Sequence, residues 1–265
     1  MLAMEQETKV KYYSDEVHED FANNGIKAKK VDSNYKYINK NPFSIFFGNL
    51  LLVLLFPIAK FVAWMLYHPK FVGKKEVLRK VKKQGYYIYS NHVLEVDPLI
   101  IPTYSNIFKK CYIAASAETF SINPFVSWLV KSFGGFPVPN TPEMYYRYVD
   151  FIKHVISKKR RVLMYPEAHI WPYCNWIRAY TSTSFKYPVM TNSPIVVFTT
   201  CFVPGKPGKK PKKVIYVDGP LYPNKDLPYE KAVEDLRNQC FDTMSNRAKR
   251  YSTVEYIKYV KKEKD

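Results

Sequence analysis

The most informative stretch of the chain is residues 90–98, which read Ser90-Asn91-His92-Val93-Leu94-Glu95-Val96-Asp97-Pro98. They place His92 and Asp97 five residues apart, directly after an apolar run that ends at Tyr89. A histidine needs a carboxylate to fix its tautomer and stabilise its charged form before it can serve as a general base. An aspartate followed by a proline is also typical of a helix start, with the aspartate as N-cap. The spacing therefore allows two interpretations, a catalytic pair or a capping aspartate beside an ordinary loop histidine.

Four further segments follow this motif, and their order is more specific than any one of them. They are Ala117-Glu118-Thr119-Phe120 with Pro124, Gly134-Gly135-Phe136-Pro137-Val138, Tyr165-Pro166-Glu167-Ala168, and Ser193-Pro194-Ile195-Val196-Val197. Together with Asn91-His92 and Asp97-Pro98, they resemble the ordered sequence blocks of the glycerolipid acyltransferase family, whose type members acylate 1-acylglycerol-3-phosphate. The resemblance covers about residues 84–222.

The resemblance implies a reaction and a set of site residues. His92 would remove the proton from an acceptor hydroxyl while that oxygen attacks an acyl thioester, and Asp97 would hold the imidazole. The donor would be acyl-CoA or an acyl carrier protein, with no cofactor and no metal. We expect four residues to bind substrate, namely Asn91, Glu167, His169 and Arg178. Two of them also fit simpler roles, His169 as a hydrogen-bonded loop residue and Arg178 as a surface cation.

The chain departs from the family pattern at the three positions that usually supply basic ligands for the phosphate of the acceptor. The second block ends in Pro139-Asn140, the third continues as Ala168-His169-Ile170, and Ala115-Ser116-Ala117 lacks a lysine. A phosphomonoester requires fixed, charge-assisted donors, preferably a bidentate arginine. Three hypotheses stay open. The acceptor is 1-acylglycerol-3-phosphate, with Arg178 or a neighbour as the phosphate ligand; or it is a non-phosphate lipid such as a glycolipid or aminolipid; or the chain is a non-catalytic lipid-binding relative.

The charge balance predicts an anionic partner. The chain carries 41 lysine and arginine residues against 23 acids, for a net charge of +18. Such a balance suits nucleic acid or an anionic membrane surface. The sequence contains no nucleic-acid-reading signature, so we expect no nucleic-acid partner and assign the charge to lipid. The four cysteines, at 111, 174, 201 and 240, form no CxxC pair and indicate a reducing compartment without a zinc site.

An apolar run from Pro42 to Tyr67 favours a membrane partner, since Lys60 is its only charge. The run is long enough to cross a hydrocarbon core, which takes roughly 20 residues. Pro57 and Lys60 divide it into shorter pieces, and both flanks are rich in lysine. We therefore expect a helical hairpin or re-entrant anchor at residues 42–68, which enters and leaves on the cytoplasmic face of the membrane. The alternative is a buried core helix beside a solvated basic loop.

The rest of the pattern alternates short apolar runs with helical stretches, which indicates an α/β fold. We predict a mixed, largely parallel central sheet flanked by helices, with an N-terminal membrane-associated helical hairpin. The expected strands cover residues 86–90, 111–115, 161–165, 195–202 and 214–217, and the expected helices cover 98–108, 123–133, 142–159 and 229–251. The predicted domains are a polar segment at 1–41, irregular with some helix, the anchor at 42–68 and an acyltransferase domain at 69–265. We expect the lysine-rich tail beyond about Tyr259 to fray.

Overall fold

A seven-stranded sheet is the centre of the molecule. The computed structural model describes residues 9–22, 35–38, 41–105, 110–121 and 123–262. The strand order is β2-β8-β7-β3-β6-β4-β5. Strands β3 to β7 run parallel to one another, β8 is antiparallel to β7, and β2 is parallel to β8. The strands are β2 (Lys70–Val72), β3 (Tyr86–Ser90), β4 (Cys111–Ala115), β5 (Gly135–Pro137), β6 (Arg161–Met164), β7 (Ile195–Val203) and β8 (Lys212–Leu221). The predicted mixed, largely parallel sheet is confirmed, and each expected strand falls on an observed one.

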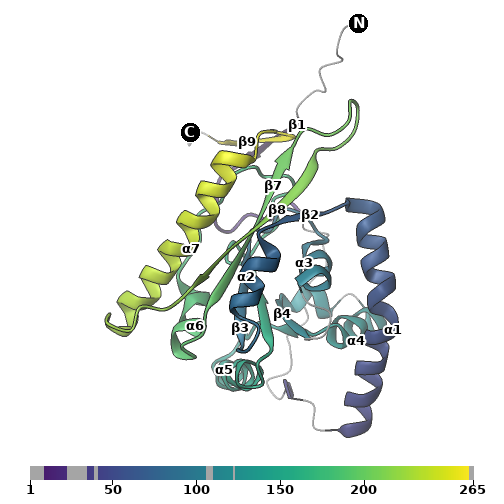
Figure 1. Ribbon diagram of the computed structural model, residues 1–265, viewed down its shortest axis with the longest axis vertical. Coiled ribbons are helices and arrows are strands. Elements are labelled where there is room, and N and C mark those ends of the chain that lie inside the picture. The colour runs from purple at the N-terminus through teal and green to yellow at the C-terminus, as the bar shows by residue number, and fades with distance from the viewer. Residues whose placement is uncertain (1–8, 23–34, 39–40, 106–109, 122, 263–265) are drawn as a thin grey trace, which may run out of the picture.

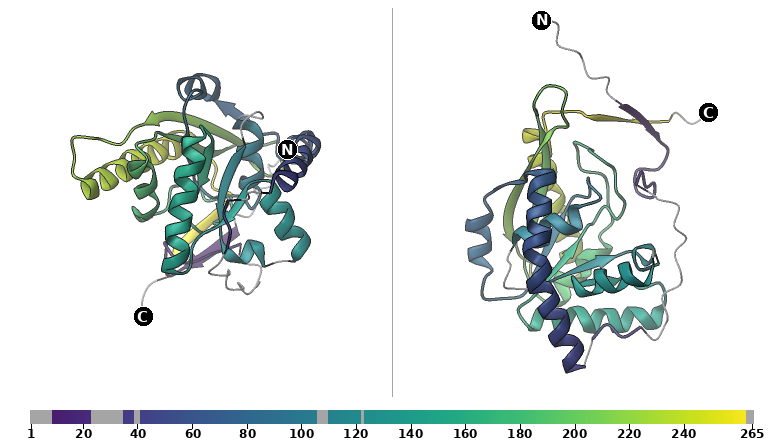
Figure 2. Two further views of the ribbon diagram at one scale, coloured as in Figure 1. Left: turned by 90° about the horizontal axis from the view of Figure 1, so that it is seen from below. Right: turned by 90° about the vertical axis from the view of Figure 1, so that its right-hand side faces the viewer.

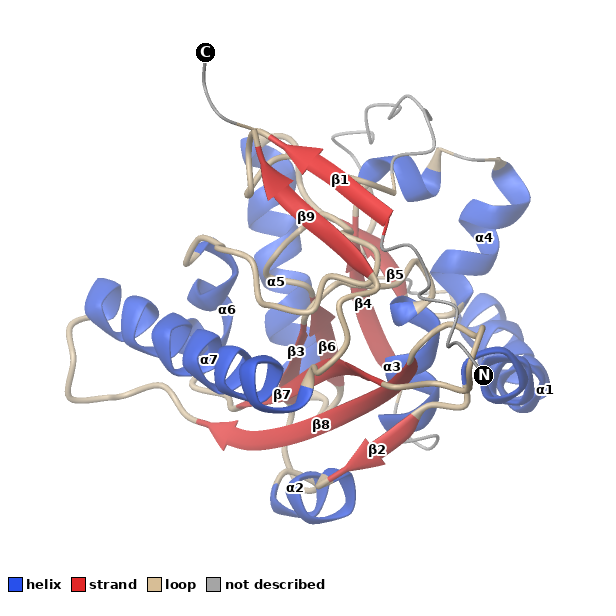
Figure 3. Cartoon of the chain, turned by 90° about the horizontal axis from the view of Figure 1, so that it is seen from above, coloured by secondary structure: helices blue, strands red, loops and turns tan. Residues whose placement is uncertain are grey.

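Helices cover both faces of this sheet (Figures 1 and 3). Side chains alternate along β3, so that Tyr86 and Ile88 enter one buried cluster while Tyr87 and Tyr89 enter another. The first cluster includes side chains of α1, α2 and α3, and the second includes side chains of α5, α6 and α7. The helices are α1 (Pro42–Tyr67), α2 (Lys74–Lys80), α3 (Asp97–Ser105), α4 (Pro124–Ser132), α5 (Pro142–Ser157), α6 (Lys186–Met190) and α7 (Tyr229–Tyr251), with 3-10 turns η1 (Ala117–Phe120) and η2 (Thr183–Phe185).

The apolar run forms one continuous helix, α1, so the predicted hairpin is wrong. Asn41 caps its start, because the side-chain oxygen accepts the N–H groups of the second and third residues after it. Pro57 lies inside the helix without ending it. A proline removes one hydrogen-bond donor, and the apolar residues on either side keep the same helical path. Lys60 is accommodated as well, since its carbonyl accepts the hydroxyl of Tyr104 at 3.2 Å and its Nζ lies 5.6 Å from the centre of that ring.

Helix α1 is also not the buried core helix of the alternative interpretation. Among the described residues, it is the one helix long and apolar enough to cross a membrane, with 24 residues from Pro42 to Met65 and a mean hydropathy of 2.2. The most apolar part of this segment contains no buried residue. An apolar helix with this exposure is compatible with membrane anchoring.

The two ends of the chain pair with each other, which the sequence analysis did not expect. Strand β1 (Lys9–Tyr13) runs parallel to β9 (Ile257–Lys261) in a separate two-stranded sheet. Their aromatic side chains explain the pairing, because the rings of Tyr13 and Tyr259 both pack on Trp171, with centroids 4.8 Å and 4.7 Å from it. Residues 9–13 and 257–261 therefore form a pair of strands against the loop after β6, where an irregular segment and a frayed tail were predicted. Residues 1–8, 23–34, 39–40 and 263–265 of those predictions lie outside the described residues.

Candidate active site

His92 and Asp97 face each other across the short loop between β3 and α3. Nδ1 of His92 lies 3.3 Å from Oδ2 of Asp97. The same oxygen accepts the backbone N–H groups of Val93 at 2.9 Å and Leu94 at 2.8 Å. These two amides precede the helix, so Asp97 folds the loop back on itself. The interpretation of Asp97 as the N-cap of α3 is therefore wrong. Because Nδ1 faces a carboxylate, Nε2 is the nitrogen left to accept a proton.

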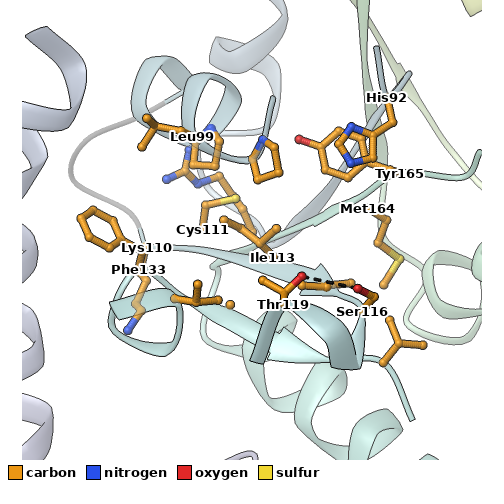
Figure 4. Close-up of a pocket in the computed structure, with 18 of the residues that line it drawn as sticks. His92, Leu99, Lys110, Cys111, Ile113, Ser116, Thr119, Phe133, Met164 and Tyr165 are labelled. Atoms are coloured by element: carbon orange, nitrogen blue, oxygen red, sulfur yellow. Dashed lines mark hydrogen bonds between the residues drawn. The ribbon is translucent and has the colours of Figure 1, made fainter. Parts of the chain in front are cut away.

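The ring of Tyr165 stacks on the imidazole of His92. The ring centroids are 4.0 Å apart and the planes differ by 18°, and both residues line the same cavity (Figure 4). The hydroxyl of Tyr165 is buried and has no hydrogen-bond partner among the described residues. Burial, followed by the nearby Asp97 carboxylate, raises the pKa of Tyr165 well above its ordinary value. Its hydroxyl thus stays protonated and can donate a hydrogen bond to a bound group.

Glu167 and Arg178 form a buried ion pair behind the histidine. Nη2 of Arg178 lies 3.4 Å from Oε2 of Glu167, and the two side chains are 0% and 1% exposed. Glu167 also accepts the backbone N–H of His92 at 3.0 Å and that of Arg178 at 3.0 Å. Arg178 donates further to the carbonyl of His169. Neither Glu167 nor Arg178 lines the cavity. This placement differs from the expected binding role and makes the pair a brace for the loop that holds His92.

Asn91 and His169 complete the set of expected binding residues. The amide of Asn91 is buried and pairs with the backbone of β7, donating to the Thr200 carbonyl at 3.0 Å and accepting the Thr200 N–H at 2.8 Å. This side chain extends the β3–β7 pairing past the end of β3, and so its polar atoms are already used. His169 does line the cavity, with Nδ1 3.7 Å from Oδ2 of Asp20. Of the four residues, only His169 reaches the cavity.

A segment from the N-terminal region, residues 9–22, closes over the loop after β6. Oε1 of Glu16 accepts the N–H of Ala179 at 2.6 Å, and the carbonyl of Glu16 accepts Nη1 of Arg178 at 3.3 Å. The indole of Trp171 donates to the carbonyl of Glu19 at 2.7 Å. We call residues 9–22 the clasp. Two sets of contacts connect the clasp to His92. Glu16 accepts a hydrogen bond from Arg178, and Glu167, the ion-pair partner of Arg178, accepts the backbone N–H of His92.

The cavity beside His92 has a volume of about 1540 Å³. Its walls come from α1, α3, α4, the strands β4 and β6, the segment before β6 and the loops that follow β3, β4 and β6. Figure 4 shows the part of the wall that includes His92, Tyr165, Leu99 and Ile113. Most of the wall is apolar, including Leu52, Val53, Phe56, Leu99, Ile113, Leu129, Val130, Phe133 and Met164. The dimensions and the lining suit a long hydrocarbon chain better than a small polar metabolite.

The acidic and the basic residues of the cavity wall lie at opposite ends of the strands. Acidic side chains lie toward the His92 end, with Glu95 in its loop, Glu118 after β4 and Asp20 against His169. The basic residues adjoin the opposite, amino ends of β4 and β6, and are Lys110, Lys158, Lys159, Arg160 and Arg161. Burial, followed by the nearby Arg160, lowers the pKa of Lys110 to about 8. Among the described wall residues, no lysine or arginine lies at the His92 end.

Comparison with known proteins finds a matching family model and a similar fold. The family model described as Acyltransferase matches residues 69–199. Among solved structures, the chain is similar to the 1-acyl-sn-glycerophosphate (LPA) acyltransferase PlsC from Thermotoga maritima, with a TM-score of 0.57 and 14% sequence identity, over 82% of this chain and 87% of that chain. Residues 69–199 thus resemble an acyltransferase domain. The structural likeness extends to the fold of this acyltransferase and not to its substrates. No curated protein sequence matches this chain.

Sequence reasoning missed two parts of the candidate site. The clasp lies outside every family block, and only the aromatic residues that pack on Trp171 signalled its contact with the loop. Tyr165 belongs to one of the sequence blocks described above. Whether its hydroxyl has a hydrogen-bond partner, however, depends on the groups that surround it in three dimensions. A hydroxylated aromatic directly before Pro166-Glu167 was the one signal in the sequence.

Proposed function

We propose that this protein transfers a fatty acyl group from an acyl thioester to a hydroxyl of a lysophospholipid-type acceptor at a membrane. The observation that carries the proposal is the placement of His92, which is paired with Asp97, at the wall of a large apolar cavity. The match of residues 69–199 to the Acyltransferase family model supports the reaction class. The donor would be acyl-CoA or an acyl carrier protein.

The proposed step needs one base and one donor. Nε2 of His92 takes the proton of the acceptor hydroxyl while that oxygen attacks the thioester carbonyl, and Asp97 stabilises the imidazolium that forms. The Tyr165 hydroxyl is a candidate donor to the negative charge that develops on the carbonyl oxygen. When the carbon–sulfur bond breaks, the thiolate receives the proton from His92. The ester and the free thiol are then the products, and no acyl-enzyme is required.

Helix α1 supports membrane association for this function. Its exposed apolar surface would be unfavourable in water, and Asn49, Leu52, Val53, Phe56 and Pro57 of the same helix line the cavity. A lipid acceptor held by the membrane would thus meet the helix and the cavity together. We place the protein at the cytoplasmic face of the membrane, consistent with the lysines that flank the helix on both sides.

The first candidate acceptor is 1-acylglycerol-3-phosphate, by similarity to the acyltransferase PlsC. One observation favours a second candidate, an acceptor without a phosphomonoester, such as a glycolipid or aminolipid. The wall at the His92 end carries Asp20, Glu95 and Glu118, whereas Arg178 is occupied by Glu167. A dianionic phosphate beside these carboxylates would be repelled, but an ammonium or a set of hydroxyls would not.

An acceptor panel tests the proposal. Detergent-solubilised protein is mixed with labelled acyl-CoA or acyl carrier protein and with lysolipids that carry phosphate, zwitterionic, amine or sugar headgroups, and the products are identified by mass spectrometry. Ester formation with 1-acylglycerol-3-phosphate supports the first candidate, and a preference for uncharged or cationic headgroups supports the second. No product with any acceptor, from protein that remains folded, would favour a non-catalytic lipid-binding role.

A further inference from the structure

A lysine-rich loop joins β7 to β8 at the edge of the sheet where His92 lies. We call residues 204–213, which contain five lysines and no acid, the lysine loop. Strand β7 is parallel to β3 and continues from Phe198, the partner of Ser90 at the end of β3, to Val203, five residues further. The lysine loop therefore begins about 16 Å past the end of β3. Figures 1 and 2 show it projecting beyond the sheet, at the end of the molecule where β1 and β9 lie.

The lysine loop has a defined shape. The N–H of Lys209 donates to the carbonyl of Lys206 at 3.0 Å, and Pro207 and Gly208 lie between them, with a φ of 70° at Gly208. A proline followed by a glycine with positive φ is typical of a type II turn. The loop contains three prolines in all, and each fixes its own φ. Because these residues restrict the backbone, a partner that binds the loop orders little that is not ordered already.

The positive charge of the lysine loop faces solvent. Its exposed lysines are Lys206, Lys209, Lys210 and Lys212. Among the described residues, none of these four forms an ion pair with a carboxylate. The carbonyl of Phe202, at the end of β7, accepts the N–H of Thr253, and β9, which follows that segment, adds the exposed Lys258 and Lys261. A cluster of cations without counter-charges of its own attracts an anionic partner.

Contacts connect the lysine loop to the loop that holds His92. The Nζ of Lys210 lies 5.9 Å from the ring centre of Tyr173. The backbone N–H of Tyr173 in turn donates to the carbonyl of Val93, next to His92, at 3.0 Å. A partner bound to the lysine loop would thus lie beside the catalytic histidine.

The two candidate donors differ in what they could present to this surface. Both carry the acyl thioester on a pantetheine arm, which has the backbone length of about four residues and extends to roughly 14 Å. This length is close to the distance by which β7 outreaches β3. An acyl carrier protein is a small acidic domain, so that a carrier held at the lysine loop could extend its thioester to His92. An anionic membrane matches the charge as well, but apart from proline the loop offers no apolar side chain for insertion into lipid.

We propose that the lysine loop is a docking surface for an acidic acyl carrier protein, which makes the carrier protein the preferred acyl donor. This inference rests on the acyl transfer in the proposed function and decides between its two donors. The exposed lysines would attract the carrier protein from a distance and so raise the rate of association. The pantetheine arm would then reach past the lysine loop to His92.

The variant Lys206→Glu/Lys209→Glu/Lys212→Glu tests the docking surface and leaves Lys210 beside Tyr173. The matched control Lys153→Glu/Lys225→Glu/Lys231→Glu makes the same change of charge at exposed positions on α5 and at the start of α7. Both are assayed in detergent micelles with one acyl group on carrier protein and on CoA, and thermal unfolding shows whether each is folded. Relative to the control, kcat/KM of the loop variant should fall about tenfold or more with acyl carrier protein and stay unchanged with acyl-CoA. An equal loss with both donors, or no loss with acyl carrier protein, would overturn the proposal.

A binding measurement tests the surface without acyl transfer. Fluorescence anisotropy of labelled carrier protein with a free pantetheine thiol gives its Kd for each protein. The Kd should rise about tenfold for the loop variant and little for the control, and wild-type binding should weaken as salt is added. Equal Kd values for the loop variant and the control would contradict the proposal, whether or not any acceptor is acylated. A wild type that uses acyl-CoA but neither binds nor uses the carrier protein would refute the docking surface and leave the proposed function intact.

A third measurement separates a carrier protein from an anionic membrane as the partner. Wild type and both triple variants are sedimented with vesicles of phosphatidylcholine and phosphatidylglycerol. We expect the loop variant and the control to bind these vesicles equally. If the loop variant binds vesicles more weakly than the control but keeps normal turnover with acyl carrier protein in micelles, the lysine loop contacts lipid headgroups and the proposal is wrong.

Discussion

At the scale of single residues, the site depends on one carboxylate oxygen. Oδ2 of Asp97 lies within hydrogen-bond reach of Nδ1 of His92 and of the N–H groups of Val93 and Leu94. The two backbone bonds fix the oxygen even when the imidazole is neutral. Its negative charge is therefore in place before the imidazolium forms, and little reorganisation is required during proton transfer.

The variant Asp97→Asn separates this charge from the shape of the loop. An amide oxygen can still accept the two backbone N–H groups, and so the thermal unfolding midpoint should stay close to that of the wild type. The imidazolium loses its counter-charge, and kcat should fall about a hundredfold or more, a typical contribution for acid–base catalysis. Steady-state kinetics and calorimetry on the same preparation measure both. An unchanged kcat would argue against a catalytic role for the pair.

The variant Tyr165→Phe tests the unpaired hydroxyl. Phenylalanine keeps the ring that stacks on His92 but removes the donor, and so kcat should fall roughly ten- to hundredfold with little change in KM. Stability should stay the same or rise slightly, because a buried hydroxyl without a partner is costly. If the variant instead unfolds at a lower temperature with normal kcat, the hydroxyl has a structural partner.

At the scale of elements, the sequence predicted the parts whose signals are local. The strands β3, β4, β6 and β7 are continuous apolar runs, as expected for a parallel sheet buried on both faces, and α7 begins and ends at the predicted residues. The predicted hairpin was wrong because neither Pro57 nor Lys60 interrupts α1, whose apolar residues continue along one helix on both sides of them. The β1–β9 pairing could not be predicted, since it joins residues about 250 positions apart and depends on Trp171 between them.

In the site, too, the local features were predictable from the sequence and the long-range ones were not. The proximity of His92 and Asp97 was predictable, because the two residues are only five positions apart and a tight turn joins them. The sequence did not reveal that Glu167 and Arg178 would pair with each other, because ten residues of irregular loop lie between them. A charged residue in a family block can bind substrate or brace the loop, and only the burial of both partners decides between these roles.

The variant Arg178→Ala tests the brace. Removal of one partner leaves the Glu167 carboxylate buried without its counter-charge, which should destabilise the protein by about 3–5 kcal/mol, measured by denaturant unfolding. Glu16→Ala removes only the acceptor of the Ala179 N–H and should cost about 1–3 kcal/mol, while Glu16→Gln should restore most of it. A stable Arg178→Ala protein with a raised KM for phosphate-bearing acceptors alone would instead identify Arg178 as a phosphate ligand.

At the scale of the whole molecule, buried thiols and phenols predict sensitivity to alkali. Burial raises the pKa of Cys111 to about 11, and those of Cys174, Cys240 and Tyr86 to about 12. Unfolded cysteines and tyrosines ionise at their ordinary values, near 9 and 10. The unfolded state therefore loses protons first, and stability that is complete below about pH 9 is lost as the pH rises toward 12.

The measurement for this prediction is the unfolding midpoint as a function of pH. It should be nearly constant around neutrality and fall progressively above about pH 9. Cys240→Ala removes one of the buried thiols from α7 and should make this decline less steep. A midpoint that stays constant to pH 11 would show that these groups are not held protonated by the fold.

The central claim is that His92 transfers a proton during acyl transfer to a membrane lipid. The most direct test is to incubate membranes that carry wild type or His92→Ala with labelled acyl-CoA, and with acyl carrier protein, in the presence of the best acceptor from the panel. We expect acylated lipid from the wild type, and a loss of product in the variant despite equal folding and equal membrane binding. Product formation by His92→Ala at the wild-type rate would contradict the proposed mechanism.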